Sequence, residues 1–115
     1  MPMTTTDPAL DRLVRRIVER VDPVAIYLFG SLATGEADEE SGYDLLIVVD
    51  DGFPPGQATV STALAVVDDL ALPVDALMVR VGEFERRRHE VGTLSYEVGH
   101  RGRRIYDRGQ RSRVA

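Results

Sequence analysis

The chain has no cysteine and no lysine among its 115 residues. Without cysteine, neither a disulfide framework nor a thiolate metal site can form. No apolar run is long enough to cross a membrane, and the first residues do not have the pattern of a signal peptide. These absences exclude several classes of secreted, membrane and zinc proteins, and they favour a cytoplasmic location.

Several catalytic patterns are also missing. The two histidines, His89 and His100, have no acidic partner at a spacing typical of a metal site. There is no Ser-His-Asp or Cys-His pattern, no P-loop and no dinucleotide-binding fingerprint. We therefore expect both histidines at the surface or at helix ends, and chemistry carried by other residues.

Length and charge limit the architecture and the partners. With 43% hydrophobic residues, the chain can form one core, so residues 1–115 are expected to be a single domain with a flexible leader (1–6) and tail (109–115). Residues 1–79 carry a net charge of −10 and residues 80–115 a net charge of +5, all of the basic residues being arginine. This asymmetry is compatible with nucleotide or RNA contact, or with ion pairing between the halves. We favour ion pairing, because the net charge of −5 opposes binding to nucleic acid.

Hydrophobic periodicity predicts alternating helices and strands. Asp7-Pro8 is typical of a helix start, and Asp22-Pro23 of its end. Further helices are expected at 57–70, 83–90 and from 93 to 99 or 101, and strands at 24–29, 45–49 and 74–81, with a final apolar segment at 104–106 packed against the core. The sequence thus predicts an α/β fold.

The most informative stretch runs from Ile26 to Asp51. A buried strand ends at Gly30-Ser31, where a glycine lets the backbone approach a ligand and a serine supplies a hydroxyl. Asp44 opens the next strand, and a carboxylate there is a ligand that a divalent cation prefers. Phosphate on one side and metal on the other would suit a nucleotide. Taken without Asp44 and Asp75, Gly30-Ser31 is more typical of an ordinary strand-to-helix turn.

These residues resemble a known signature. Gly30-Ser31, ten intervening residues and then Gly42-Tyr43-Asp44 are similar to the Gly-Ser-x10-Asp-x-Asp motif of the DNA polymerase β-like nucleotidyltransferase superfamily, and Asp75 matches its third aspartate. Ala33 and Gly35 also match, and the short length and the ending GHRGRRIYD resemble minimal nucleotidyltransferases, many of which are antitoxins of HEPN-family toxins. The resemblance covers roughly residues 10–108. It implies the polymerase β-like fold, a mixed sheet of three to four strands with helices packed on it.

The resemblance also implies a function. Family members transfer AMP from ATP to a hydroxyl with Mg²⁺, so Gly30 and Ser31 are expected to bind the nucleotide, and Asp44 and Asp75 to be the catalytic metal ligands. Because so small a domain has little surface for recognising an acceptor, we expect the acceptor hydroxyl on a partner, plausibly a tyrosine of a HEPN-family toxin. Taken without the resemblance, Asp75 would be an ordinary ion-pairing or capping residue of an edge strand.

One position departs from the motif. The first metal-binding aspartate of the family is replaced by Gly42, which supplies no carboxylate, so we expect transfer to be severely impaired. Glu39 or Glu40 is a possible replacement ligand. The alternative is a degenerate nucleotidyltransferase that acts as a binding module, either an antitoxin that neutralises its toxin by complex formation or a nucleotide-sensing subunit. A small-molecule transferase is a third interpretation, but the chain lacks an extra domain to hold such a substrate.

Overall fold

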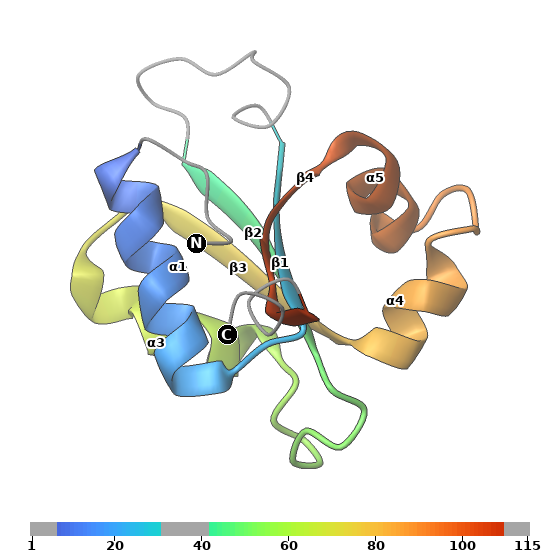
Figure 1. Cartoon of the computed structure of the whole chain (residues 1–115), viewed down its shortest axis with the longest axis horizontal. Coiled ribbons are helices and arrows are strands. Elements are labelled where there is room, and N and C mark those ends of the chain that lie inside the picture. Colours follow the sequence, from blue (N-terminus) through green and yellow to red (C-terminus); the bar gives the residue numbers. More distant parts are fainter. Residues whose placement is uncertain (1–6, 31–41, 110–115) are drawn as a thin grey trace.

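The computed structural model describes residues 7–30 and 42–109. In this part of the chain, four strands form one mixed sheet with helices on both faces (Figure 1). The elements in chain order are α1 (Pro8–Val21), β1 (Ala25–Phe29), β2 (Tyr43–Val49), α3 (Val60–Val67), the 3₁₀ helix η1 (Asp68–Leu70), β3 (Val74–Arg80), α4 (Val81–Arg87), α5 (Leu94–Arg101) and β4 (Arg103–Asp107). The predicted α/β class and mixed sheet are confirmed.

The strand order is β3-β2-β1-β4. Strand β1 is antiparallel to both β2 and β4, whereas β2 and β3 are parallel. A parallel pair needs a crossover, and α3 with η1 supplies it between β2 and β3. The same ends of β2 and β3 therefore lie side by side, where the sequence places two aspartates.

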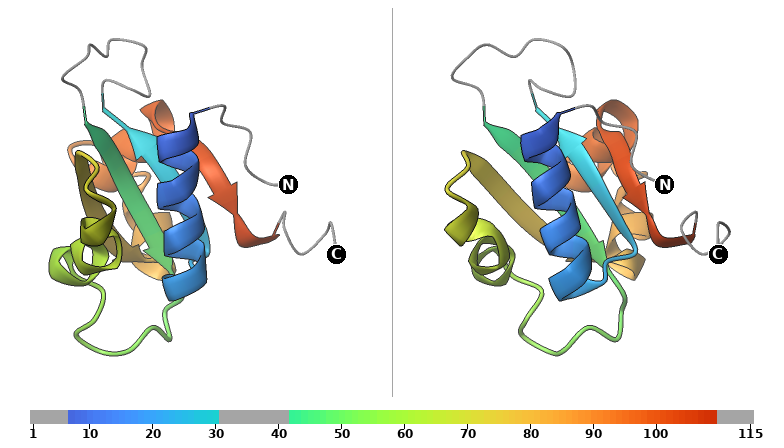
Figure 2. Two further views of the ribbon diagram at one scale, coloured as in Figure 1. Left: turned by 90° about the vertical axis from the view of Figure 1, so that its left-hand side faces the viewer. Right: turned by 60° about the vertical axis from the view of Figure 1, so that its left-hand side comes forward.

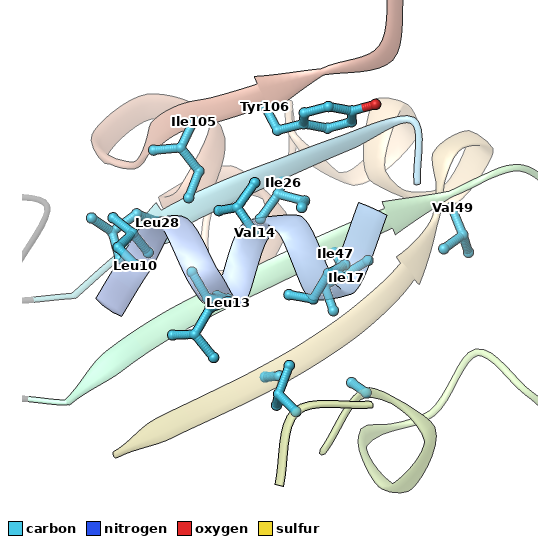
Figure 3. Close-up of a cluster of buried hydrophobic side chains, with 14 residues drawn as sticks. Leu10, Leu13, Val14, Ile17, Ile26, Leu28, Ile47, Val49, Ile105 and Tyr106 are labelled. Carbon is cyan, nitrogen blue, oxygen red and sulfur yellow. The ribbon is translucent and has the colours of Figure 1, made fainter. Parts of the chain in front are cut away.

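Helices α1 and α3 cover one face of the sheet, and α4 and α5 cover the other (Figures 1 and 2). The residues of β2 alternate between these faces: Leu45, Ile47 and Val49 belong to the core under α1 and α3, while Leu46 and Val48 pack with α4 and α5. Figure 3 shows the larger core, into which α1 projects its apolar stripe. The fully buried residues of that stripe are Leu13, Val14 and Ile17.

Helix α1 begins and ends as its sequence predicts. The Asp7 carboxylate accepts hydrogen bonds from the backbone N–H groups of Ala9 and Leu10, and Pro8 occupies the first helical position. Asp22 ends the helix in a left-handed conformation with φ of 52°. The Tyr43 hydroxyl donates to the same Asp7 carboxylate at 2.7 Å, which joins the start of β2 to the start of α1.

Other boundaries differ from the predictions. The helix expected at 57–70 is shorter, because Thr59 caps α3 through its hydroxyl and the last three residues tighten into η1. The apolar segment at 104–106 is the centre of strand β4, which pairs with β1. Residues 31–41, which include Ala33 and Gly35 of the motif, lie outside the described residues.

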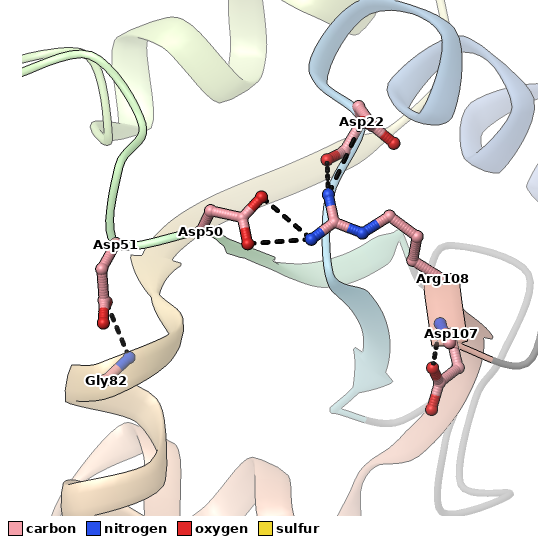
Figure 4. A network of polar contacts seen from close by, with 7 residues as sticks. Asp22, Asp50, Asp51, Gly82, Asp107 and Arg108 are labelled. Atoms are coloured by element: carbon pink, nitrogen blue, oxygen red, sulfur yellow. Dashed lines mark hydrogen bonds and ion pairs between the residues drawn. The ribbon is translucent and has the colours of Figure 1, made fainter. Parts of the chain in front are cut away.

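Ion pairs join the two halves of the chain, as the charge asymmetry suggested. Arg108, just after β4, donates two hydrogen bonds to the Asp50 carboxylate and one to the Asp22 carbonyl (Figure 4). Arg80 donates to the carbonyls of Asp51, Phe53 and Pro54 in the loop after β2. Some of the C-terminal arginines thus hold loops in place. Within the described residues, no helix combines the length and apolarity needed to cross a membrane.

Candidate nucleotide and metal site

Gly30 follows the last residue of β1 and makes a turn that few other residues would adopt. Its φ is +75°, in the left-handed region that favours glycine. A Cβ atom built on Gly30 would lie 2.3 Å from Oδ2 of Asp44, far inside van der Waals contact. Glycine is therefore required here both by the backbone and by the neighbouring carboxylate.

Asp44 and Asp75 lie opposite each other in the parallel ladder of β2 and β3. Neighbouring strands are about 4.8 Å apart, so two paired side chains on one face are close neighbours. Alternation along the strands gives Asp44 the same face as Leu46, and Asp75 the same face as Leu77, and both leucines pack with the α4 and α5 cluster. Both carboxylates thus lie on the α5 face, at the end of the sheet where β1 turns at Gly30.

The surroundings of Asp44 disfavour the ionised form of its carboxyl. Partial burial raises the pKa of the Asp44 carboxyl above its usual value, and repulsion from Asp75 raises it further. A bound cation would relieve that repulsion and favour the ionised form of both carboxyls. Tyr43 takes no part, because its side chain lies on the opposite face, where burial and Asp7 raise its pKa to about 12.

Gly42 occupies the position where the resemblance places the first metal-binding aspartate. A Cβ atom on Gly42 would lie 2.9 Å from the carbonyl oxygen of Pro73, closer than real Cβ atoms come to such an atom. That oxygen is held in place, since it accepts the backbone N–H of Tyr43 at 2.8 Å. The Pro73 carbonyl therefore occupies the space that a side chain at position 42 would need. A larger residue there requires a shift of β2 relative to β3.

The donor set fits one Mg²⁺ ion better than two. Mg²⁺ is commonly held by one or two carboxylates together with water and substrate phosphates, and Asp44 and Asp75 supply that number. No group of three or more acidic, histidine or cysteine side chains able to hold a metal exists within 7–30 and 42–109. Ser31, Glu39 and Glu40, predicted for the nucleotide site or as replacement ligands, lie outside these ranges.

A cavity of about 240 Å³ opens beside Gly30 on the same face as the two carboxylates. Among the described residues, Phe29 and Gly30 of the β1 end and Glu97 and Arg101 of α5 line it. No local pattern in the sequence connects α5 with the Gly30 turn, because the charged residues of α5 belong to the arginine-rich part of the chain, residues 80–115. The sequence signal for this contact is Gly102, whose lack of a side chain lets the end of α5 approach β1 closely.

A larger cavity, of about 460 Å³, lies elsewhere on this face. It is lined largely by apolar residues of β3 and by the segment that leads into α5, and it includes the exposed side chains of Val60 and Leu94. Neither Gly30 nor either aspartate lines it. Of these two cavities, only the smaller one is lined by Gly30, and neither aspartate is among the described residues that line it.

The fold and this end of the sheet define a small α/β domain with a carboxylate pair next to a tight glycine turn. Residues 10–100 match the model of the nucleotidyltransferase domain family, and the chain therefore belongs to that family. The membership agrees with the resemblance to minimal nucleotidyltransferases that the Gly-Ser motif indicated.

Two solved structures share the fold. One, described as a toxin-antitoxin with AMP-PNP, is 19% identical with a TM-score of 0.59, and the match covers 90% of this chain and 77% of that one. The other is a "putative nucleotidyltransferase from Sulfolobus solfataricus", 22% identical with a TM-score of 0.55, covering 94% of this chain and 95% of that one. No curated protein matches the sequence.

Proposed function

We propose that this chain binds ATP with Mg²⁺ where β1 ends and β2 begins, and that it transfers AMP to a hydroxyl of a partner protein with release of pyrophosphate and the hydroxyl proton, with activity limited by Gly42. The observation that carries the proposal is the register of β2 and β3, which sets Asp44 opposite Asp75 beside the Gly30 turn. Family membership supports the same assignment.

Four residues of the chain are proposed to bind the ion and the phosphates. Asp44 and Asp75 would hold the ion, which supplies positive charge to neutralise the phosphates and to stabilise the oxygens at the reacting phosphorus. Gly30, without a side chain, leaves the backbone open to the phosphate chain. Ser31 is proposed to donate its hydroxyl to the same phosphates.

Gly42 explains why transfer should be slow. Two-metal transfer needs one ion at the attacking oxygen and one at the leaving oxygen. Two described carboxylates are enough for an ion shared with the phosphates, but they leave no dedicated ligand for a second ion. We therefore expect nucleotide binding to be retained more fully than chemistry.

The partner is proposed to be a toxin of the HEPN family, and the acceptor a hydroxyl on it, such as that of a tyrosine. A single small domain offers little surface that could enclose both a nucleotide and an acceptor, so a second protein must present the hydroxyl. The similarity in fold to a chain from a toxin-antitoxin structure containing AMP-PNP supports this proposal.

The test is co-expression of the chain with a candidate HEPN-family toxin, followed by intact-mass measurement of that partner after incubation with ATP and MgCl₂. The expected result is slow addition of the mass of AMP, which Asp44→Asn and Asp75→Asn variants abolish. An unmodified partner after prolonged incubation, with complex formation intact, would count against transfer.

The second candidate function is an antitoxin that neutralises its partner by complex formation, or a nucleotide-sensing subunit, without chemistry. It is favoured by the contact of Gly42 with Pro73, which leaves no room for the missing carboxylate without a backbone shift. Under this proposal the partner co-purifies unmodified, and Asp44→Asn inhibits the toxin as well as the wild type does. Failure to form any complex would exclude it.

A further inference from the structure

Helix α5 brings a cation to the candidate nucleotide site. Arg101 is the last residue of α5 and lines the cavity of about 240 Å³ together with Gly30, where any Cβ atom would collide with the Asp44 carboxylate. Asp44 and Asp75 belong to the same face of the sheet, by the alternation already described. The phosphate chain of a nucleotide bound beside Gly30 would therefore lie between the carboxylate pair and the end of α5.

The position of Arg101 is fixed by the residue that follows it. A Cβ atom on Gly102 would lie 2.6 Å from the carbonyl oxygen of Val98 and 3.1 Å from that of Leu28. The φ of Gly102 is −79°, so glycine is needed for space and not for its backbone conformation. Strand β4 then begins at Arg103, which pairs with Leu28 of β1. The end of α5 is thus held directly against the end of β1.

The Arg101 guanidinium is available to a ligand. Its side chain is 78% exposed, and its ion pair with Glu97 is long, at 3.7 Å, and itself open to solvent. Exposed pairs of this kind contribute little to stability, so their exchange for a better anion costs little. A phosphate group offers several charged oxygens that match the planar fork of a guanidinium.

We propose that Arg101 is a phosphate-binding residue of the nucleotide site, contacting the triphosphate from the α5 side while the carboxylate pair holds Mg²⁺ on the other. This assignment rests on the proposed nucleotide binding and deepens it. It also explains how a site that lacks one carboxylate ligand could keep its affinity for ATP, because part of the phosphate charge is neutralised without a metal.

The test is calorimetric titration of ATP, with MgCl₂ present, into the wild type, Arg101→Gln, Arg101→Lys and a matched control, Arg20→Gln. Arg20 is also an exposed arginine at the end of a helix, but α1 covers the opposite face of the sheet. Loss of one charge-assisted contact should weaken ATP binding about tenfold or more in Arg101→Gln. Arg101→Lys should retain part of the affinity, and Arg20→Gln should bind as the wild type does.

A parallel titration with adenosine, which lacks phosphates, distinguishes the loss of a phosphate contact from a change in the shape of the binding site. Adenosine affinity should be the same in the wild type and in Arg101→Gln, and both proteins should have the same melting temperature. Equal ATP affinity in these two proteins, or equal weakening of ATP and adenosine, would overturn the assignment of Arg101 alone. A wild type that binds no ATP would overturn the proposed function, and this inference with it.

Discussion

The substitution Gly42→Asp restores the carboxylate that the family motif has and this chain lacks. Its steric cost to stability follows from the contact at Pro73. The new Cβ atom would meet the Pro73 carbonyl oxygen at 2.9 Å, and that carbonyl cannot turn away without losing its hydrogen bond to the Tyr43 N–H. A shift of a few tenths of an ångström in a packed parallel pair costs about 1–2 kcal/mol.

The carboxylate adds a second cost that depends on metal. If the alternation of β2 continues back by one residue, the side chain at position 42 is on the same face as Asp44 and Asp75. Without metal, three neighbouring carboxylates repel one another, so Gly42→Asp should be less stable than Gly42→Ala, which shares only the steric cost. With Mg²⁺ at about ten times its dissociation constant, binding should return about 1.4 kcal/mol to the Asp variant.

The assay is thermal unfolding of the wild type, Gly42→Ala and Gly42→Asp, with and without MgCl₂. Each kcal/mol corresponds to a shift in melting temperature of about 4 °C in a domain of this size. Mg²⁺ should raise the melting temperature of Gly42→Asp by several degrees more than that of Gly42→Ala. An Ala variant as stable as the wild type would refute the steric argument, and an equal response of both variants to Mg²⁺ would refute the placement of position 42 at the metal site.

Three further substitutions test other parts of the structure. Gly30→Ala should lower the free energy of unfolding by about 1–3 kcal/mol and abolish ATP binding, because its φ is positive and its Cβ would displace the Asp44 carboxylate; wild-type affinity in a titration would contradict this. Gly102→Ala should cost a similar amount in urea unfolding, since its Cβ collides with two carbonyl oxygens, and an unchanged midpoint would show that α5 adapts. Arg108→Gln should cost about 0.5–1 kcal/mol at pH 7. Because the Arg108 hydrogen bonds lower the pKa of Asp50, the part of this loss that comes from Asp50 should be full above the carboxyl's unfolded pKa of about 4 and should disappear as the pH falls through the lower folded value. The part that comes from the Asp22 carbonyl should remain, and a difference independent of pH would refute the pairing with Asp50.

The local signals in the sequence predicted the elements well. The ends of α1 follow from Asp7-Pro8 and Asp22-Pro23, whose capping chemistry involves only adjacent residues. The strand pattern also predicted that Asp44 and Asp75 lie near the start of their strands, and each is the second residue of its strand. The sequence did not show that Asp44 and Asp75 are paired, because this requires their strands to be neighbours. Strand order depends on long-range packing and not on local pattern.

Long-range contacts account for what the sequence did not reveal. Strand β4 was expected only as an apolar segment, because nothing local shows that it pairs with β1 across about 80 residues of chain. The same pairing, with the close approach of Gly102, brings Arg101 to Gly30. The contact between Gly42 and Pro73 likewise joins two loops that are distant in sequence. Each of these features bears on the candidate site.

The most direct test of the account is a calorimetric titration of MgATP into the wild type and into an Asp44→Asn/Asp75→Asn double variant. Removing both carboxylates leaves the fold and Gly30 in place but eliminates the described metal ligands. We expect Mg²⁺-dependent ATP binding by the wild type, and binding that does not depend on Mg²⁺, or no binding, by the double variant. Equal Mg²⁺-dependent binding by both proteins, or no binding by the wild type, would contradict it.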